Sequence, residues 1–266
     1  MDLLNEVQVV LPPLLEQQAI ASVLSLVDDK LESNGRAQSL ALSVAQCLLA
    51  GGGNSVRVGD VAALSRGLSY KGAGLVESPD AASVPMVNLA NFTTRGWLKG
   101  SGLKYYKGDF KTQHVLKAGD LVLANTDLTQ NRVILGRGAL VSPYLDGCIY
   151  SHHTSVLKFQ DPIFKLFAWA QLQSSAFRER AEGFATGTTV TALPKEAVLD
   201  FALSLPSKRT ELTRVTARAE VLLSRVWALE AEDAVLNRAK ALLLPSLMDG
   251  SLRPADPSRL VKEVTA

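Results

Sequence analysis

Hydrophobic residues recur at intervals of seven in the last quarter of the chain. Val215, Leu222, Leu229, Leu236 and Leu243 form this series, and charged residues fill much of the space between them. Such a heptad pattern is typical of a coiled-coil helix. We therefore predict a helix over residues 206–250 that stops near Pro245, with a length on the order of 55–60 Å at about 1.5 Å per residue.

A second apolar series predicts another long helix over residues 14–50. Ile20, Leu24, Val27 and Leu31 supply its helical spacing. Gly35 lies in its middle, and a glycine inside a helix costs roughly 1 kcal/mol, so a kink is expected there. The glycines at positions 51–53 predict its end.

The two helical segments resemble an internal repeat. A shift of 194 residues places Leu11-Pro12 on Leu205-Pro206, and it aligns apolar residues at both helix ends. Residues 6–10 and 200–204 each read as a short strand that runs into Leu-Pro. An antiparallel helix pair of this length exceeds what a small domain needs for its own core, which favours a spacer or an assembly surface.

Between the helices, residues 51–205 have a different texture. Short β-like runs at 55–58, 84–87, 121–123, 133–135, 139–141 and 154–157 are separated by turn signals, and one helix is predicted over 162–182. The sequence thus predicts an α+β fold. One globular domain with a mostly antiparallel curved sheet is flanked by two long helices that form an antiparallel coiled coil. The predicted parts are an entry strand (1–13), the first helix (14–50), the globular domain (51–205), the second helix (206–250) and a tail (251–266).

Composition sets broad limits on the class of protein. Hydrophobic residues make up 47% of the 266 positions and charged residues 20%, as in globular proteins. No apolar run is long enough to cross a bilayer, and residues 1–6 lack the features of a secretory signal. With only Cys47 and Cys148 available, neither a disulfide framework nor a zinc site is expected. These features predict a cytoplasmic protein without a membrane partner.

Local charge points to nucleic acid more clearly than the net charge of +2 does. Residues 95–117 hold six basic side chains and one acidic one, interleaved with aromatic residues. Basic groups neutralise phosphates, and aromatic groups touch sugars and bases. Residues 125–132 and 184–191 are rich in amides and hydroxyls that can contact base edges or phosphates. A solvated hairpin and ordinary turn chemistry remain the alternatives for these segments.

We therefore choose a set of candidate DNA-contacting residues. They are Ser69, Tyr70, Lys71, Asn91, Lys104, Tyr105, Tyr106, Lys107, Lys111, Asn125, Thr126, Thr129, Gln130, Arg132, His152, His153, Thr186, Thr188 and Thr189.

No catalytic or metal site is predicted. His152 and His153 are adjacent in a strand-like segment, so their side chains should point to opposite faces and a shared metal ion is disfavoured. Neither an adenine methylation motif, nor a Gly-rich cofactor loop, nor a Walker A sequence, nor a nuclease carboxylate cluster is recognisable. A polar loop that faces DNA, or a structural role, fits the two histidines better.

Four segments resemble the specificity subunits of type I restriction-modification systems. Residues 11–24 (LPPLLEQQAIASVL) look like the start of their conserved spacer helix, and residues 119–127 (GDLVLANTD) like a strand and loop of their target-recognition domains. Residues 187–193 (GTTVTAL) and 242–252 (LLLPSLMDGSL) also fit. The resemblance thus covers nearly the whole chain, in a half-length form with a single target-recognition domain.

The resemblance implies sequence-specific recognition of double-stranded DNA by a non-catalytic subunit. It implies no cofactor for this chain, and partner methyltransferase (M) and restriction (R) subunits, of which the M subunit uses S-adenosylmethionine. Because typical members carry two recognition domains, we expect two copies to assemble as a homodimer that reads a bipartite target. The helix positions Ile20, Leu24, Val27, Leu31, Val215, Leu222, Leu229, Leu236 and Leu243 are expected to form the dimer or partner surface. A different partner chain, a stand-alone DNA-binding regulator and a coiled-coil scaffold are the alternatives.

Overall fold

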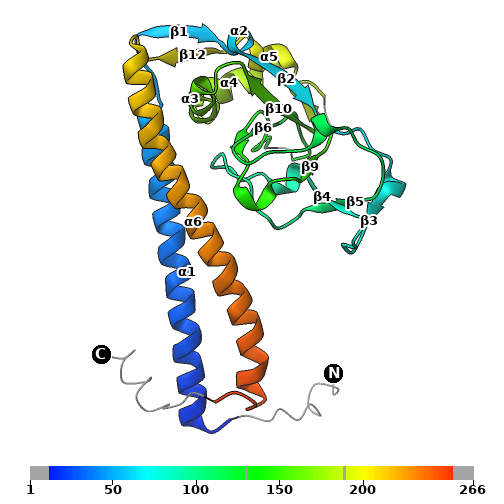
Figure 1. Cartoon of the computed structure of the whole chain (residues 1–266), viewed down its shortest axis with the longest axis vertical. Coiled ribbons are helices and arrows are strands. Elements are labelled where there is room, and N and C mark those ends of the chain that lie inside the picture. The colour runs from blue at the N-terminus through cyan, green and yellow to red at the C-terminus, as the bar shows by residue number, and fades with distance from the viewer. Residues whose placement is uncertain (1–11, 130, 188–189, 254–266) are drawn as a thin grey trace. The chain divides into compact units, whose positions relative to one another are not determined.

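The computed structural model describes residues 12–129, 131–187 and 190–253. It divides into two compact units (Figure 1). Unit 1 comprises residues 1–41 and 224–266, and unit 2 comprises residues 42–223. The strands all lie in unit 2, together with residues 42–48 and 209–223 of the two long helices.

The elements follow one another along the chain as α1 (Leu14–Leu48), β1 (Asn54–Arg57), α2 (Val58–Val61), β2 (Ala62–Arg66), η1 (Gly72–Gly74), β3 (Leu75–Val76), β4 (Val84–Val87), η2 (Leu89–Asn91), β5 (Lys104–Tyr106), η3 (Thr112–His114), β6 (Leu121–Ala124), β7 (Thr126–Asp127), β8 (Gly138–Leu140), η4 (Pro143–Leu145), β9 (Ile149–Tyr150), β10 (Thr154–Phe159), α3 (Ile163–Gln171), α4 (Ser175–Phe184), β11 (Thr191–Ala192), α5 (Lys195–Leu199), β12 (Ala202–Leu205) and α6 (Arg209–Met248).

In unit 1, helices α1 and α6 run antiparallel and side by side (Figure 1). Lys240 Nζ of α6 donates to Asp28 Oδ2 of α1 at 2.7 Å. Further along α1, Lys30 lies 3.2 Å from Glu232, so residue numbers rise on one helix as they fall on the other. The two predicted long helices are confirmed, while their supercoiling remains a prediction.

Asn34 joins α1 to α6 beside Gly35, where the sequence predicts a kink or bend within a continuous helix. The side chain is 2% exposed, and its Nδ2 donates to Glu232 Oε2 at 3.0 Å and to Asp233 Oδ1 at 2.7 Å. Gln38 Nε2 donates to Asp233 Oδ2 at 2.7 Å. These bonds join α1 to α6 across the position of Gly35, and α1 remains helical to Leu48. A buried polar group of this kind fixes the register of paired helices, because a shifted register would leave it unsatisfied.

The predicted stop of the second helix at Pro245 is wrong. Pro245 lies inside α6, and the helix continues to Met248. Proline removes one hydrogen bond of the helix, but this loss falls in the last turn, where few further bonds depend on it. Gly250, with φ of +76°, follows the end of the helix in a left-handed conformation that suits glycine.

In unit 2 the strands form four small sheets. A four-stranded antiparallel sheet has the order β2-β10-β6-β8, and a second has the order β3-β5-β4-β9, in which only β4 and β9 are parallel. The pairs β1-β12 and β7-β11 complete the set. The predicted fold class is confirmed, as a mostly antiparallel sheet domain between two long helices. Its strands divide into several sheets instead of one.

The main core of unit 2 lies around the first of these sheets. Val122 of β6 and Val156 of β10 are fully buried with Tyr150 of β9 in one hydrophobic cluster. Helix α3 packs against strands β8, β10 and β12 with Phe167 and Trp169 fully buried. This packing gives a rigid support for the loops that leave the sheet edges.

Two local predictions in this unit are wrong. The predicted helix over 162–182 is divided into α3 and α4, because Ser174 begins a new helix by accepting a hydrogen bond from Phe177 N at 3.2 Å. Residues 133–135 are not a strand. Ile134 N donates to the carboxylate of Asp127 instead of to a neighbouring strand, so this segment forms turns.

Candidate nucleic-acid interface

Aromatic side chains gather where the segment after β9 meets the segment after β2. The ring centroids of His152 and His153 are 4.0 Å apart, so the prediction that the two side chains point to opposite faces is wrong, because residues 152 and 153 form a turn and not a strand. The ring centroids of Tyr70 and His152 are 5.6 Å apart. Tyr106 of β5 continues the series at 6.0 Å from Tyr70. We call Tyr70, Tyr106, His152 and His153 the aromatic cluster. These rings are tilted or edge-on to one another, and aromatic groups of this kind offer surfaces for sugars and bases.

Positive charge surrounds the aromatic cluster. Arg66 Nε, at the end of β2, donates to the His152 carbonyl at 3.3 Å. His153 Nδ1 lies 2.9 Å from Thr126 Oγ1. Burial lowers the pKa of His153, and the positive charges of His152, Lys104 and Arg66 lower it further. The cluster therefore lies in a positive local field, as expected of a surface that binds phosphates.

Burial, together with this field, gives a pH prediction for His153. We expect its ring protons to titrate below about 6.5, the ordinary value, in NMR spectra of the protein without DNA. At a pH between the lowered pKa of His153 in the folded protein and its ordinary pKa in the unfolded chain, the unfolded chain binds more protons. The contribution of His153 therefore makes the free energy of unfolding fall as the pH falls through this range. The His153→Gln variant should lose this part of the pH dependence. A midpoint for His153 at or above its ordinary value would contradict the description of the field.

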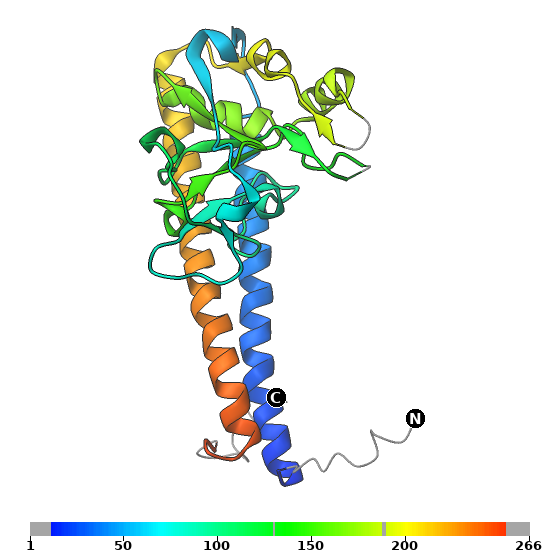
Figure 2. The ribbon, with the colours of Figure 1, turned by 90° about the vertical axis from the view of Figure 1, so that its right-hand side faces the viewer.

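The second feature of the interface is a pair of loops that extend from strands β7 and β11. Asp127 pairs with Thr191, and Thr126 pairs with Ala192, in antiparallel register. The chain that leaves β7 and the chain that enters β11 therefore emerge at the same end of the pair. Figure 2 shows the green strand β7 and the yellow strand β11 beside each other. The two segments predicted to read bases are thus brought together.

Asp127 holds the loop after β7 in a defined shape. Its carboxylate is 1% exposed, and Oδ1 accepts from Thr129 N and from Thr129 Oγ1, each at 2.7 Å. Its Oδ2 accepts from Ile134 N at 2.8 Å. From α4, Arg178 donates to the carbonyls of Leu135 at 2.8 Å and Arg132 at 2.9 Å. The loop that carries Arg132 is therefore fixed at both ends.

Replacing Asp127 with Asn tests this role. The Asn amide has only one acceptor oxygen. Its N–H group would therefore face one of the donors from which the Asp127 carboxylate now accepts a hydrogen bond. Loss of one such bond to a charged, buried group should cost about 2 kcal/mol of unfolding free energy. Urea unfolding measures this, and hydrogen exchange at Thr129 and Ile134 should rise. The exposed Asp109 gives a matched control, Asp109→Asn, which should leave both readings unchanged. Unchanged exchange in Asp127→Asn would contradict the assignment.

The remaining predicted residues differ in their exposure and in their partners. Ser69, Lys71, Lys104, Lys111, Thr129 and Thr186 are exposed, and Tyr105 and Arg132 are half-buried. Lys107 is exposed but forms an ion pair with Asp80 at 3.0 Å. The carboxylate of Asp80 therefore offsets part of the attraction of Lys107 for a phosphate. Gln130, Thr188 and Thr189 lie outside the described residues.

Asn91 requires a correction. Its side chain is fully buried, and its Nδ2 donates to the carbonyls of Lys99 at 3.0 Å and Ser101 at 3.2 Å. Its Oδ1 accepts from Asn88 N at 2.8 Å. In this structure Asn91 shapes a turn and is not exposed to a ligand. The amide was chosen for its chemistry, but the sequence carried no signal of its burial.

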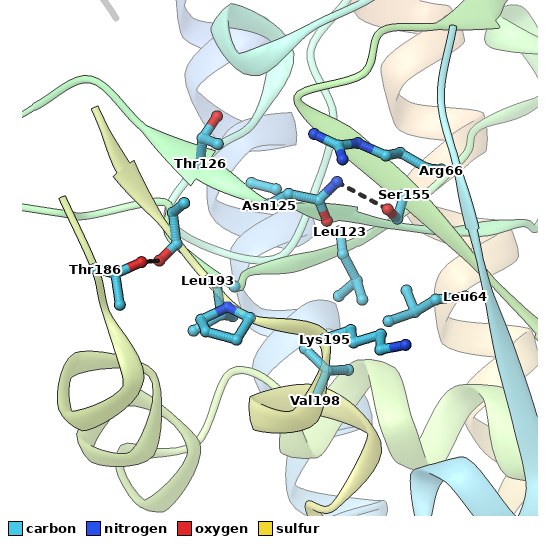
Figure 3. A pocket seen from close by; sticks show the side chains of 14 residues that line it. Leu64, Arg66, Leu123, Asn125, Thr126, Ser155, Thr186, Leu193, Lys195 and Val198 are labelled. Carbon is cyan, nitrogen blue, oxygen red and sulfur yellow. Dashed lines mark hydrogen bonds between the residues drawn. The ribbon is translucent and has the colours of Figure 1, made fainter. Parts of the chain in front are cut away.

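A pocket of about 430 Å³ opens beside the paired loops, within unit 2 (Figure 3). Leu64 of β2, Leu123 of β6 and Val198 of α5 provide apolar walls. Its polar lining includes Arg66, Asn125, Thr126, Ser155, Thr186 and Lys195. Sequence reasoning singled out Asn125, Thr126 and Thr186 but missed Arg66 and Lys195. The position of Arg66 three residues before Ser69 was the one local signal for it.

The described ranges, 12–129, 131–187 and 190–253, contain no group of three or more His, Cys, Asp or Glu side chains that could hold a metal ion. Over those same ranges, no helix has both the length and the apolar character needed to cross a membrane.

Comparison with solved structures identifies the fold. The S subunit of a type I restriction-modification system from M. genitalium matches 91% of this chain with a TM-score of 0.57 and 14% sequence identity. The chain has the fold of a type I S subunit. It spans 61% of the length of that S subunit. No family model and no curated protein sequence matches the chain.

Two further solved structures match over the same share of the chain. One is the HsdS subunit of Thermoanaerobacter tengcongensis, at 18% identity and a TM-score of 0.43, matched over 60% of its own length. The other comes from work on the assembly and conformational transition of the type I restriction-modification system, at 17% identity and a TM-score of 0.46, matched over 61% of its length.

Proposed function

We propose that this chain recognises a specific sequence in double-stranded DNA as the specificity subunit of a type I restriction-modification complex. The observation that carries the proposal is the aromatic cluster with Arg66 and Lys104 around it, next to the paired loops. Cations and aromatic rings supply contacts with phosphates and sugars, and the amides and hydroxyls of the loops supply contacts with base edges. The S-subunit fold supports this reading.

The proposal separates binding from chemistry. In it the chain is not an enzyme and binds no cofactor of its own. Methyl transfer from S-adenosylmethionine belongs to a partner M subunit, and cleavage belongs to a partner R subunit. Co-purification from the native host tests this division, because association with an M subunit is expected. Methyl transfer by the purified chain alone would contradict it.

The phosphate contacts have a direct test in the double variant Arg66→Ala, Lys104→Ala. Each cation that neutralises a phosphate contributes about one unit to the slope of log affinity against log salt, so the slope should fall by about two. The matched control replaces Lys208 and Arg218 with Ala; both are exposed cations, Lys208 just before α6 and Arg218 within it. Equal salt slopes for the two double variants would contradict the assigned surface.

Dimerisation is the finer part of the proposal. Two of the predicted dimer-surface residues, Ile20 (6% exposed) and Leu229 (1%), are buried within the chain itself. Other apolar side chains of unit 1 are exposed, among them Leu26 (50%), Leu40 (66%), Val235 (68%) and Leu242 (66%). A second copy of the chain that covers them would supply a second recognition domain for a bipartite target. Light scattering should give twice the chain mass, and DNA selection should return an inverted repeat. A strict monomer that selects one unrepeated motif would contradict this part alone.

Two alternatives would give different results. A stand-alone DNA-binding regulator would select a DNA sequence but would not co-purify with a methyltransferase. A helical scaffold would bind protein partners, and replacing Lys104, Lys107 and Lys111 with Ala would then leave any DNA affinity unchanged. The charge around the aromatic cluster favours the DNA-binding classes over the scaffold.

A further inference from the structure

The pocket beside the paired loops has the features of a binding site for a flat heterocycle. Its apolar walls come from three different elements, through Leu64, Leu123 and Val198, and these side chains extend toward a common space (Figure 3). A volume of about 430 Å³ lies within the range of about 300–1,000 Å³ that is typical of ligand pockets. Such pockets combine apolar walls with a few oriented polar groups.

Asn125 provides the oriented polar group. Its backbone N–H donates to the His153 carbonyl, and its carbonyl accepts from Leu193 N, each at 2.8 Å. Its side-chain Nδ2 donates to Ser155 Oγ at 2.8 Å, and Ser155 is 5% exposed. The backbone of Asn125 is therefore fixed by two hydrogen bonds, and its side-chain amide by one. Oδ1, which is turned toward Leu123, and the second Nδ2 hydrogen form no hydrogen bond with the described residues (Figure 3).

An acceptor and a donor side by side on one amide match the edge of a nucleobase. An Asn amide pairs bidentately with adenine, since Oδ1 accepts from the exocyclic amino group and Nδ2 donates to a ring nitrogen. Arg66 and Lys195, both exposed, line the pocket and supply positive charge for the phosphates on either side of such a base. The lining thus combines apolar contact, base-edge pairing and phosphate neutralisation.

Leu128 lies close to the pocket and suits a second role. It is 63% exposed, and it directly follows the buried Asp127, whose bonds to Thr129 fix the turn around it. Because Thr126 lines the pocket two residues earlier and consecutive Cα atoms are about 3.8 Å apart, the Cα of Leu128 lies at most about 7 Å from that of Thr126. Exposed leucines can insert between base pairs and unstack them.

We propose that the pocket binds one nucleobase that has left the DNA stack, with adenine preferred, and that Leu128 fills the position it leaves. The inference rests on the proposed DNA recognition and extends it, because base contacts in the grooves do not require a pocket of this kind. It assigns Asn125 to base-edge pairing inside the pocket and Leu128 to unstacking.

The test compares two duplexes, one with a given adenine paired and one with that adenine as a single-nucleotide bulge, each with 2-aminopurine as the neighbouring base. A base that is already unpaired avoids the cost of unstacking, so the protein should bind the bulged duplex roughly tenfold more tightly. A fluorescence change of the 2-aminopurine on binding should accompany this preference. Equal affinity for the two duplexes would overturn the inference and leave DNA recognition standing, whereas failure to bind either duplex would overturn both.

A variant that blocks the pocket tests whether the preference for the bulged duplex arises there. Thr186 is exposed at the rim of the pocket, so Thr186→Trp can fill the pocket without disturbing the core. It should abolish the preference for the bulged duplex over the paired one. Thr213→Trp, at an exposed position of α6, is the matched control and should retain the preference. Retention of the preference in Thr186→Trp would overturn the assignment of this pocket.

Titration with free deoxyadenosine monophosphate tests whether the base in the pocket comes from DNA or from a soluble nucleotide. Methyl signals of Leu64, Leu123 and Val198 report occupancy of the pocket in NMR spectra. If the bulged duplex shifts these signals, the base belongs to DNA, as proposed. If the free nucleotide shifts them while the bulged duplex does not, the pocket serves a soluble nucleotide and the inference is overturned.

Discussion

Replacing Gly67 with Ala is expected to lower the unfolding free energy by about 3 kcal/mol and to abolish DNA binding. A Cβ atom at this position would lie 2.2 Å from the Ser151 carbonyl oxygen and 2.6 Å from the Tyr150 carbonyl oxygen. Both obstacles are backbone atoms, so no change of rotamer relieves the clash. The two backbone segments must therefore separate. This separation would break the hydrogen bond that Leu68 N donates to Tyr150 O at 2.7 Å.

The consequence for function follows from the position of Gly67. It connects Arg66 to the segment that carries Tyr70, and Ser151 precedes His152 in the opposite segment. Separation of the two segments therefore disrupts the 5.6 Å contact between the Tyr70 and His152 rings and moves Arg66 away from the His152 carbonyl. Stability and DNA affinity should fall together.

Gly72→Ala is the matched control, since a Cβ there meets nothing within 4 Å. Urea unfolding and a DNA-binding isotherm, measured for both variants, check the expectation. A Gly67→Ala protein within about 0.5 kcal/mol of the parent, the range of ordinary surface substitutions, would contradict the close approach of these segments.

The second large effect is expected at Gln171, which is 6% exposed in α3. Its Nε2 donates to Ser204 O at 2.7 Å and to Leu49 O at 3.1 Å, and its Oε1 accepts from Ser204 N at 2.8 Å. One side chain thus satisfies three backbone groups, from β12 and from the residue that follows α1. Gln171→Leu would leave all three unsatisfied, at about 1–3 kcal/mol each.

We therefore expect a loss of about 3–5 kcal/mol of unfolding free energy in Gln171→Leu. Chemical denaturation measures it, with Gln113→Leu at an exposed position as the control. Near-equal midpoints for the two variants would contradict the role of Gln171 in joining these segments.

The long helices could be predicted from the sequence because heptad spacing is a local signal. Other features depend on hydrogen bonds with residues elsewhere in the chain, and the local sequence does not reveal these partners. The bonds of Asn34 to Glu232 and Asp233, which are distant in sequence, could not be read from the pattern around Gly35. Residues 133–135 have the composition of a strand, but the carboxylate of Asp127 takes the N–H group of Ile134. Tertiary hydrogen bonds decide such segments, and local pattern cannot reveal them.

The candidate interface was predictable in chemistry but not in arrangement. The amide- and hydroxyl-rich loops were recognisable from composition, whereas their meeting depends on the pairing of Asp127 with Thr191. The pocket was missed because Leu64 and Val198 look like ordinary core residues and become walls only when β2 and α5 converge. Asn91 shows the reverse error, since a suitable side chain proved to be buried.

Selection from a random pool of double-stranded DNA tests the central claim most directly. Repeated capture and amplification by the purified protein should enrich one defined sequence. The selected duplex should bind at least about a thousand times more tightly than the unselected pool at the same salt concentration. If no sequence is enriched, and the pool binds as tightly as any recovered duplex, the protein does not read DNA sequence and the proposed function is wrong.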